Sequence, residues 1–191
     1  MKITECQVLL TSALSTARIP APENTHYHRN AGRVLEMAQA YEYDGTRFFL
    51  SGDPVNALAG FYYAFGWVHF GISSGLLTTK EPVICPFKAP LELLQTPFRA
   101  KLEEKTIRYE HLLDLAMTSV ICAPDPATTS HDFARRILCI AGAYARHGVH
   151  LRKSGELEEA LAGFSYGHGW LDAGVTTGFF RIVAERHLFT V

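Results

Sequence analysis

The chain has 191 residues, of which 48% are hydrophobic and 19% are charged, and its formal net charge is −1. This composition supports a packed core and excludes an intrinsically disordered chain; the length suits one large domain or two small ones. With a pI near 6.7 the protein offers no globally basic surface to a phosphate backbone, so we expect no nucleic-acid binding.

The first half of the sequence predicts three helices. Apolar or small residues recur at helical spacing over about residues 3–18, and a second helix is expected over about 28–51. Ser51-Gly52 ends the second helix, because glycine commonly follows a helix end. Asp53 is the expected N-cap of a third helix, with Pro54 in its first position.

The second half predicts three more helices. The stretch KEPVICPFKAPLELLQT contains three prolines and is interpreted as a linker. Thr96 as N-cap and Pro97 in the first helical position predict the start of the fourth helix. Between the fifth and sixth helices, Ser154-Gly155-Glu156 stands where Ser51-Gly52-Asp53 stands in the first half.

The chain repeats itself at a shift of 103 positions. Residues 1–88 align without a gap on 104–191, with 25 identities in 88 positions. The densest identities are Ala57–Phe61 with Ala160–Phe164, Tyr63 with Tyr166, Gly66 with Gly169, Trp67 with Trp170, Gly71 with Gly174 and Gly75 with Gly178. We therefore predict an all-α fold of two tandem three-helix-bundle modules, 1–88 and 104–191, related by a pseudo-twofold axis and packed through their third helices. Residues 89–103 form the linker and the start of the next helix.

The third helix of each module is too apolar for a surface helix. On a helical wheel its apolar and small residues cover well over half of the circumference, which indicates that it packs against more than its own module. The residues left over form an expected polar stripe: Ser165, Gly169, Asp172 and Thr176. Small residues repeat at Gly60 and Gly163, and we expect these faces to line the module contact or a homo-oligomer interface. Replacing Gly163 by leucine is then expected to destabilise the fold, whereas Asp172→His, at the edge of the stripe, should cost less than about 1 kcal/mol.

The hairpin between the second and third helices predicts which residues face each other. A turn centred on Gly155 sets Tyr144 level with Tyr166, and Gly148 level with Ala162 and Gly163. The equivalent turn at Gly52 sets Tyr41 level with Tyr63.

The stretches SGDPVNALAGFYYAFGWVHFG and SGELEEALAGFSYGHGWLDAG resemble the archaeal family called domain of unknown function 357. The resemblance is best over about residues 37–77 and 140–180, and it implies a small helical bundle of archaeal origin without implying an activity. Copy two keeps Gly-Trp-Leu-Asp-Ala-Gly, whereas copy one has Val68-His69-Phe70 in place of Leu-Asp-Ala. If that aspartate has a function in the family, only Asp172 could serve here.

One set of residues predicts a ligand site, an aromatic pocket between helices two and three. It comprises Tyr144, Tyr166 and Trp170, rimmed by His168 or Asp172, with Tyr41, Tyr63 and Trp67 as the first copy's aromatics. Aromatic residues at helical spacing are more often core, so small-ligand binding is the alternative interpretation. The leading one is a non-enzymatic interaction or scaffold module, with a protein partner or a second copy of the chain.

The sequence gives little support for a catalytic site or a metal site. His147, His150, His168 and Asp172 suggest a metal site, but the hairpin places His147 about 7 Å along the axis from His168, and zinc ligands lie about 2 Å from one point. Arg181 and His187 fit a ribonuclease-type spacing that chance alone would produce in this sequence. We assign no catalytic residue, no metal site and no cofactor.

The remaining features concern the cellular setting. Four cysteines (Cys6, Cys85, Cys122 and Cys139) are scattered without a C-x-x-C pair, which predicts free buried thiols in a reducing compartment. The start MKITECQVLL is too polar for a signal peptide, and no run of about 18 apolar residues predicts a membrane span. We expect a cytoplasmic protein.

Overall fold

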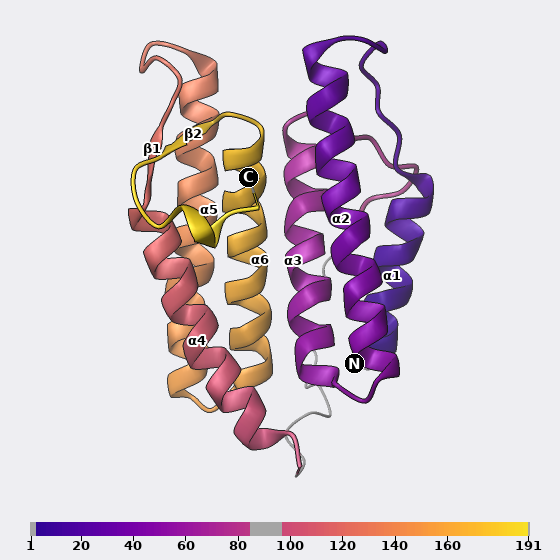
Figure 1. Ribbon diagram of the computed structural model, residues 1–191, viewed down its shortest axis with the longest axis vertical. Coiled ribbons are helices and arrows are strands. Elements are labelled where there is room, and N and C mark those ends of the chain that lie inside the picture. Colours follow the sequence, from indigo (N-terminus) through magenta and orange to yellow (C-terminus); the bar gives the residue numbers. More distant parts are fainter. Residues whose placement is uncertain (1–2, 85–96, 191) are drawn as a thin grey trace.

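The computed structural model describes residues 3–84 and 97–190, and it folds as six long helices in two modules (Figure 1). The first module consists of α1 (Ile3–Thr16), α2 (His26–Leu50) and α3 (Pro54–Ser73). The second consists of α4 (Arg99–Thr118), α5 (Thr129–Lys153) and α6 (Leu157–Thr176), with the short elements β1 (Val120–Cys122), β2 (Phe180–Ile182) and the 3₁₀ helix η2 (Arg186–Leu188). The predicted all-α fold of two three-helix modules is confirmed.

Repeated start and stop signals set the helix boundaries in both modules. The Thr25 side chain accepts a hydrogen bond from the His28 amide, and Thr128 accepts one from the His131 amide, so α2 and α5 begin with equivalent caps. Gly52 and Gly155 adopt positive φ angles of 80° and 87° after the ends of these helices, a conformation that glycine adopts without a steric penalty.

The modules meet where α3 and α6 lie side by side at the centre of the molecule (Figure 1). A Cβ added to Gly66 would lie 3.0 Å from the Gly169 Cα, and a Cβ added to Gly169 would lie 3.2 Å from the Gly66 Cα. The same additions would collide with the carbonyl oxygens of Tyr166 and Tyr63, respectively. The contacts are reciprocal, as a pseudo-twofold axis through the two glycines requires, and only glycine at both positions lets the backbones approach this closely. We call this contact between α3 and α6 the seam.

The two modules meet at Gly66 and Gly169 and not at the expected Gly60 and Gly163. Gly60 and Gly163 face their own modules: a Cβ on Gly60 would lie 3.3 Å from the Gly45 Cα, and one on Gly163 would lie 3.8 Å from Tyr144. The small-residue pairing of the hairpin is therefore tight in copy one and relaxed in copy two, although in both copies a phenylalanine ring, Phe61 or Phe164, packs on the glycine of the second helix. The face of α6 that lies in the seam includes most of the stripe predicted to be polar: Ser165, Gly169 and Asp172 are all buried.

Three local predictions need correction. The fourth helix begins at Arg99 after Phe98, with Pro97 in the preceding turn, and the expected cap Thr96 lies outside the described residues. Glu156 stands at the N-cap of α6 without a side-chain capping bond, whereas Asp53 accepts one from the Asn56 amide. A sheet was not predicted, yet β1 and β2 pair antiparallel, and a single bridge between Arg18 and Thr78 is its counterpart in copy one.

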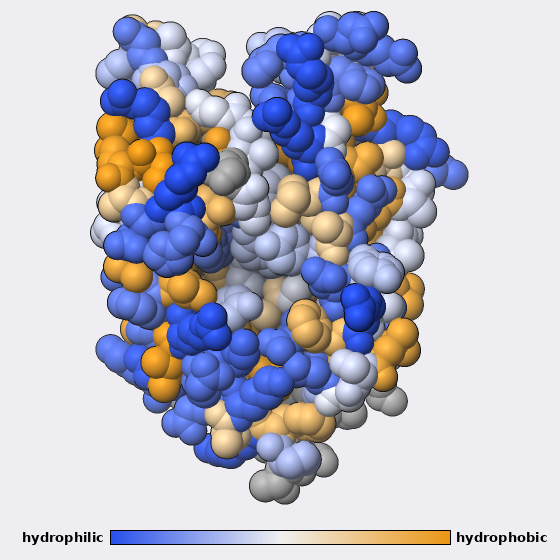
Figure 2. Space-filling view, viewed as in Figure 1, coloured by the Kyte–Doolittle hydropathy of each residue, from blue (hydrophilic) through white to orange (hydrophobic). Residues whose placement is uncertain are grey.

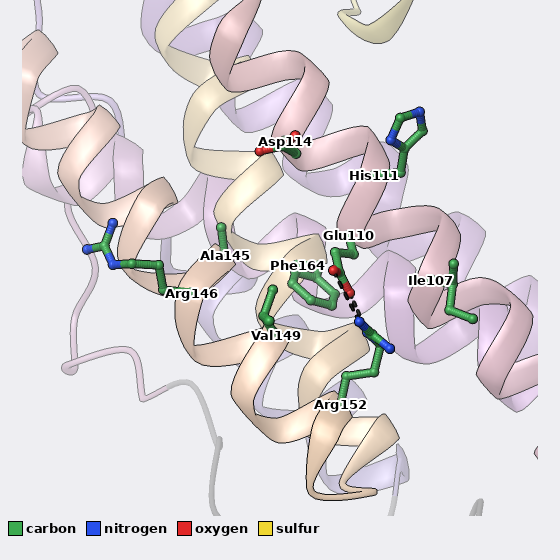
Figure 3. Close-up of a pocket in the computed structure, with 9 residues that line it drawn as sticks. All are labelled: Ile107, Glu110, His111, Asp114, Ala145, Arg146, Val149, Arg152 and Phe164. Atoms are coloured by element: carbon green, nitrogen blue, oxygen red, sulfur yellow. Dashed lines mark hydrogen bonds and ion pairs between the residues drawn. The ribbon is translucent and has the colours of Figure 1, made fainter.

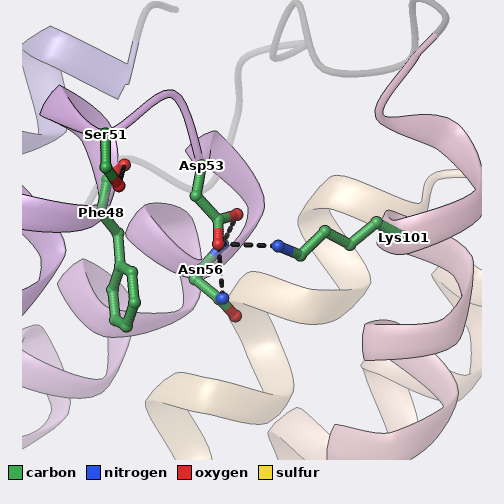
Figure 4. A network of polar contacts seen from close by, with 5 residues as sticks. All are labelled: Phe48, Ser51, Asp53, Asn56 and Lys101. Atoms are coloured by element: carbon green, nitrogen blue, oxygen red, sulfur yellow. Dashed lines mark hydrogen bonds and ion pairs between the residues drawn. The ribbon is translucent and has the colours of Figure 1, made fainter.

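A polar contact also ties the modules together at one end. Lys101 at the start of α4 donates to the Asp53 carboxylate at the start of α3, at 2.7 Å (Figure 4). Asp53 accepts from the amide and side chain of Asn56 as well, while Ser51 bonds to the Phe48 carbonyl. Burial raises the pKa of Asp53, but these hydrogen bonds and the Lys101 charge outweigh it, so that its pKa is lowered.

The described cysteines are free, but they are not all buried. Cys6 is buried, and burial raises its pKa to about 11. Cys122 is half-buried and Cys139 is exposed, whereas Cys85 lies outside the described residues. The expectation of uniformly buried thiols is therefore wrong for Cys139.

Candidate functional site

A buried carboxylate lies in the seam. Asp172 projects from α6 with no exposed surface and accepts a hydrogen bond from the Tyr63 hydroxyl of α3. The Thr190 amide and hydroxyl donate to it as well, at 3.1 and 2.8 Å. Three donors thus converge on two oxygens, a set that suits the carboxylate anion.

The pseudo-twofold axis places a different pair on the other side of the seam. Tyr166 of α6 is the counterpart of Tyr63, and its hydroxyl lies 2.8 Å from Nδ1 of His69, the counterpart of Asp172. The His69 Nε2 lies 3.0 Å from the Val83 carbonyl oxygen, so this ring nitrogen donates when the imidazole is neutral. Burial lowers the pKa of His69, although the bond to Val83 opposes the shift. The duplicated tyrosine therefore meets an anion on one side and a neutral imidazole on the other.

Each of these tyrosines packs, with its ring tilted, against a second one from its own module. The rings of Tyr41 and Tyr63 lie 4.3 Å apart, and those of Tyr144 and Tyr166 lie 4.5 Å apart, as the hairpin geometry predicts. Burial and the negative charge of Asp172 raise the pKa of Tyr41, and the same two causes hold the pKa of Tyr63 well above its ordinary value. Both hydroxyls near Asp172 therefore stay protonated at neutral pH.

The segment after β2 folds back over the Asp172 side of the seam. His168 of α6 is buried, and its Nε2 lies 3.2 Å from the Leu188 carbonyl oxygen. Burial lowers the pKa of His168, with Asp172 and the Leu188 carbonyl acting in the opposite direction. Asp172 and His168 thus hold Leu188 and Thr190 against α6.

These elements enclose a hollow of about 240 Å³ between α2, α3 and α4, which we call the seam hollow. Its lining comprises Tyr41, Ala59, Gly60, Tyr63, Tyr109, Leu112, His168, His187, Leu188, Phe189 and Thr190. Figure 2 shows the face that carries α2 and α4, which is largely hydrophilic and is hollowed between these helices. Burial also raises the pKa of Tyr109, so three neutral tyrosines line the seam hollow.

The structure divides the predicted ligand site. Tyr144 lines a separate surface hollow of about 400 Å³ with His147 and Gly163, while Tyr166 points across the seam to His69. Trp170 is buried and packs edge-on against Phe70, at 5.9 Å. His168 and Asp172, expected at the rim of the aromatic pocket, are buried on the Tyr63 side. The residues that join them there include Tyr109, Leu112 and Thr190, whose sequence positions carry no signal for a shared site.

A third concave surface lies between α4 and α5. This groove, of about 620 Å³, has the Phe164 ring at its floor and Ile107, Ala145 and Val149 on its walls (Figure 3). Glu110 and Arg152 form an ion pair across it, and His111, Asp114 and Arg146 complete the rim. The lining is therefore apolar at the centre and charged with both signs at the edge.

The other candidates of the sequence are not assembled into sites. Among residues 3–84 and 97–190, no group of three His, Cys, Asp or Glu side chains is placed to hold a metal ion. Arg181 lies exposed in β2, and His187 in η2 lines the seam hollow and pairs with Glu185. In the part of the chain described, no helix is both long enough and apolar enough to cross a membrane.

Comparison with known proteins identifies the family. The model of the family described as "Protein of unknown function (DUF357)" matches the chain twice, over residues 7–77 and 108–180. The chain therefore belongs to this family and contains a tandem duplication of its domain. No curated protein and no solved structure matches it.

Proposed function

We propose that this duplicated member of the DUF357 family is a non-enzymatic binding protein that takes a small ligand in the seam hollow. The observation that carries the proposal is a concave site built from both modules, with tyrosine rings on its walls and polar hydroxyls between them. Small-molecule sites typically combine an apolar or aromatic lining with a few placed polar groups.

The arrangement favours binding over catalysis. Asp172 is fully buried and already accepts three hydrogen bonds, so it is not free to take a proton from a bound molecule. The raised pKa values of Tyr41, Tyr63 and Tyr109 keep their hydroxyls neutral, which suits hydrogen bonding and ring contact and disfavours action as bases.

Blocking the seam hollow tests the proposal. Leu112 lines it from α4, and its counterpart in copy one is Leu9, which is 39% exposed on α1. Leu112→Trp should fill the seam hollow and abolish the binding of small molecules found by ligand-observed NMR or by mass spectrometry of the purified protein. Leu9→Trp is the matched control and should leave binding unchanged. Absence of any bound molecule in the unmodified protein, or equal binding by both variants, would contradict the proposal.

A second candidate function, association with another protein or a second copy of the chain, is favoured by the groove between α4 and α5. Ile107 on its wall is 52% exposed, and the floor is the ring of Phe164. We expect Ile107→Asp to weaken such association, which sedimentation equilibrium measures directly. A monomer at all concentrations, with no change on substitution, would eliminate self-association through this groove.

The proposal also includes the cellular location and the residue bounds of the two modules. The free, exposed thiol of Cys139 is compatible with a reducing compartment, which supports a cytoplasmic location. We retain 1–88 and 104–191 as the modules, joined by residues 89–103, which comprise the linker and the start of α4.

A further inference from the structure

We propose that the ligand of the seam hollow is a small organic cation carrying an ammonium group, held against tyrosine rings in the field of the buried Asp172 carboxylate. This inference rests on the proposed function and assigns the charge of the ligand.

The first observation is a buried negative charge without a cationic partner. Ion pairs within residues 3–84 and 97–190 join Lys101 to Asp53 and Arg152 to Glu110, and neither reaches Asp172. Its hydrogen-bond donors, the Tyr63 hydroxyl and the amide and hydroxyl of Thr190, are all neutral. Buried charges are usually paired, because an uncompensated charge in a low-dielectric interior is costly.

The second observation is the position of that charge relative to the seam hollow. Tyr63 and Thr190 both bond to Asp172 and both line the seam hollow, so the carboxylate lies directly behind its wall. Its field extends to the lining, because Asp172 disfavours the anionic form of Tyr41 and of Tyr63, and Asp44 acts on Tyr41 in the same sense. A field that opposes anions at these hydroxyls attracts a cation to the same place.

The third observation is the aromatic lining. The centroids of the Tyr41 and Tyr63 rings lie 4.3 Å apart with the rings tilted by 46°, and Tyr109 contributes a further ring from α4. Alkylammonium groups are attracted to the negative faces of aromatic rings, and aromatic cages are a recurring way to bind them. A volume of about 240 Å³ restricts the ligand to a small molecule or to the end of a side chain.

The pseudo-twofold axis supplies an internal contrast. On the other side of the seam, Tyr144 and Tyr166 form an equivalent tilted pair, but His69 replaces Asp172. Burial lowers the pKa of His69, so at neutral pH the imidazole is uncharged at the position where the other side has the Asp172 carboxylate. The duplication thus produced two tyrosine pairs, and among the described residues the Tyr41–Tyr63 pair stands beside the buried Asp172, whereas Tyr166 stands beside His69.

The experiment compares probes of one shape and different charge by isothermal titration calorimetry. Choline is the cationic probe, and its control is the alcohol in which a carbon atom replaces the quaternary nitrogen. We expect choline to bind at least about tenfold more tightly than the alcohol, from its attraction to the rings and the carboxylate. Equal affinities would overturn the assignment of charge and leave the proposed function standing, whereas failure of both probes and of a neutral and anionic fragment set would end both proposals.

Variants then locate the binding. Asp172→Asn should remove most of the preference for choline, and circular dichroism shows whether it folds. Tyr41→Leu, which leaves the carboxylate in place, should weaken choline binding at least about fivefold, whereas its counterpart Tyr144→Leu should not change it. If the two tyrosine variants weaken binding equally, the site is not in the seam hollow. A peptide carrying trimethyllysine distinguishes the two sources of an ammonium group: tighter binding of the peptide than of choline assigns it to a partner protein, and the reverse assigns it to a free metabolite.

Discussion

Substitution of Gly169 by alanine tests the close approach of α3 and α6. The added Cβ would collide with the Tyr63 carbonyl oxygen and lie 3.2 Å from the Gly66 Cα. Both are backbone atoms, so relief requires separation of the helices. Overpacking of this kind costs up to about 3 kcal/mol, and the better helix propensity of alanine returns about 1 kcal/mol. We expect a net loss of about 2 kcal/mol in the free energy of unfolding, or roughly 4–8 °C in Tm.

Gly163→Ala is the matched control in the same helix. Its Cβ would lie 3.8 Å from Tyr144, an ordinary contact, so only the gain in propensity remains. We expect this variant to be as stable as the parent or more stable by up to about 1 kcal/mol in urea unfolding followed by circular dichroism. If Gly169→Ala is as stable as Gly163→Ala, the reasoning about the seam is wrong.

Three further predictions follow from the polar contacts. Asp172→Ala should lower the free energy of unfolding by about 2–3 kcal/mol in denaturant titration, because it leaves the Tyr63 hydroxyl and the Thr190 donors unpaired. A loss below about 0.5 kcal/mol would contradict the burial of this hydrogen-bond network. At the other end of the seam, Asp53→Ala should lower the free energy of unfolding by about 1 kcal/mol, and by more than Lys101→Ala, because the first removes a helix cap and the second only a partly exposed ion pair. Since the pKa of Asp53 is lowered in the folded state, its contribution to stability is present above about pH 4 and is lost as the pH falls through the folded-state pKa. The difference between parent and Asp53→Ala in acid unfolding would show this loss. Burial lowers the pKa of both His69 and His168, so folding favours their neutral forms. The contribution of the two histidines to stability is therefore complete above the ordinary histidine pKa of 6.5 and is lost as the pH falls. The free energy of unfolding measured from about pH 7 to 5 should fall less steeply in the double variant H69Q/H168Q than in the parent.

Most of the fold could be predicted because its signals are local and occur twice. Thr25 and Thr128 cap equivalent helices, and Gly52 and Gly155 end them, so each boundary has an independent check in the other copy. The pairing of Tyr144 with Tyr166 follows from the turn geometry alone. Signals without a counterpart were less reliable, as Pro97 illustrates, because nothing in copy one constrained the start of the fourth helix.

The candidate site was predicted less well, because a helical wheel shows which residues share a face and not what covers that face. Asp172 and Gly169 were assigned to solvent on polarity and size, yet they lie on the face that meets the other module. One signal was available: glycine occupies the centre of this stripe in both copies, at Gly66 and Gly169, and such a position favours helix contact over exposure.

The sequence by itself determined the helices, most of their boundaries, the duplication and the family of this protein, since these depend on local propensity and on a repeat that is visible in the sequence. Only the tertiary structure decided that the seam runs through Gly66 and Gly169, that Tyr63 meets Asp172 while Tyr166 meets His69, and that Tyr109 and Thr190 complete a hollow on one side. The physical reason is that two similar modules can pack in many ways that satisfy the same hydrophobic pattern. The choice among them depends on backbone clearance and on the pairing of a few buried polar groups, and neither is visible until both surfaces are in contact.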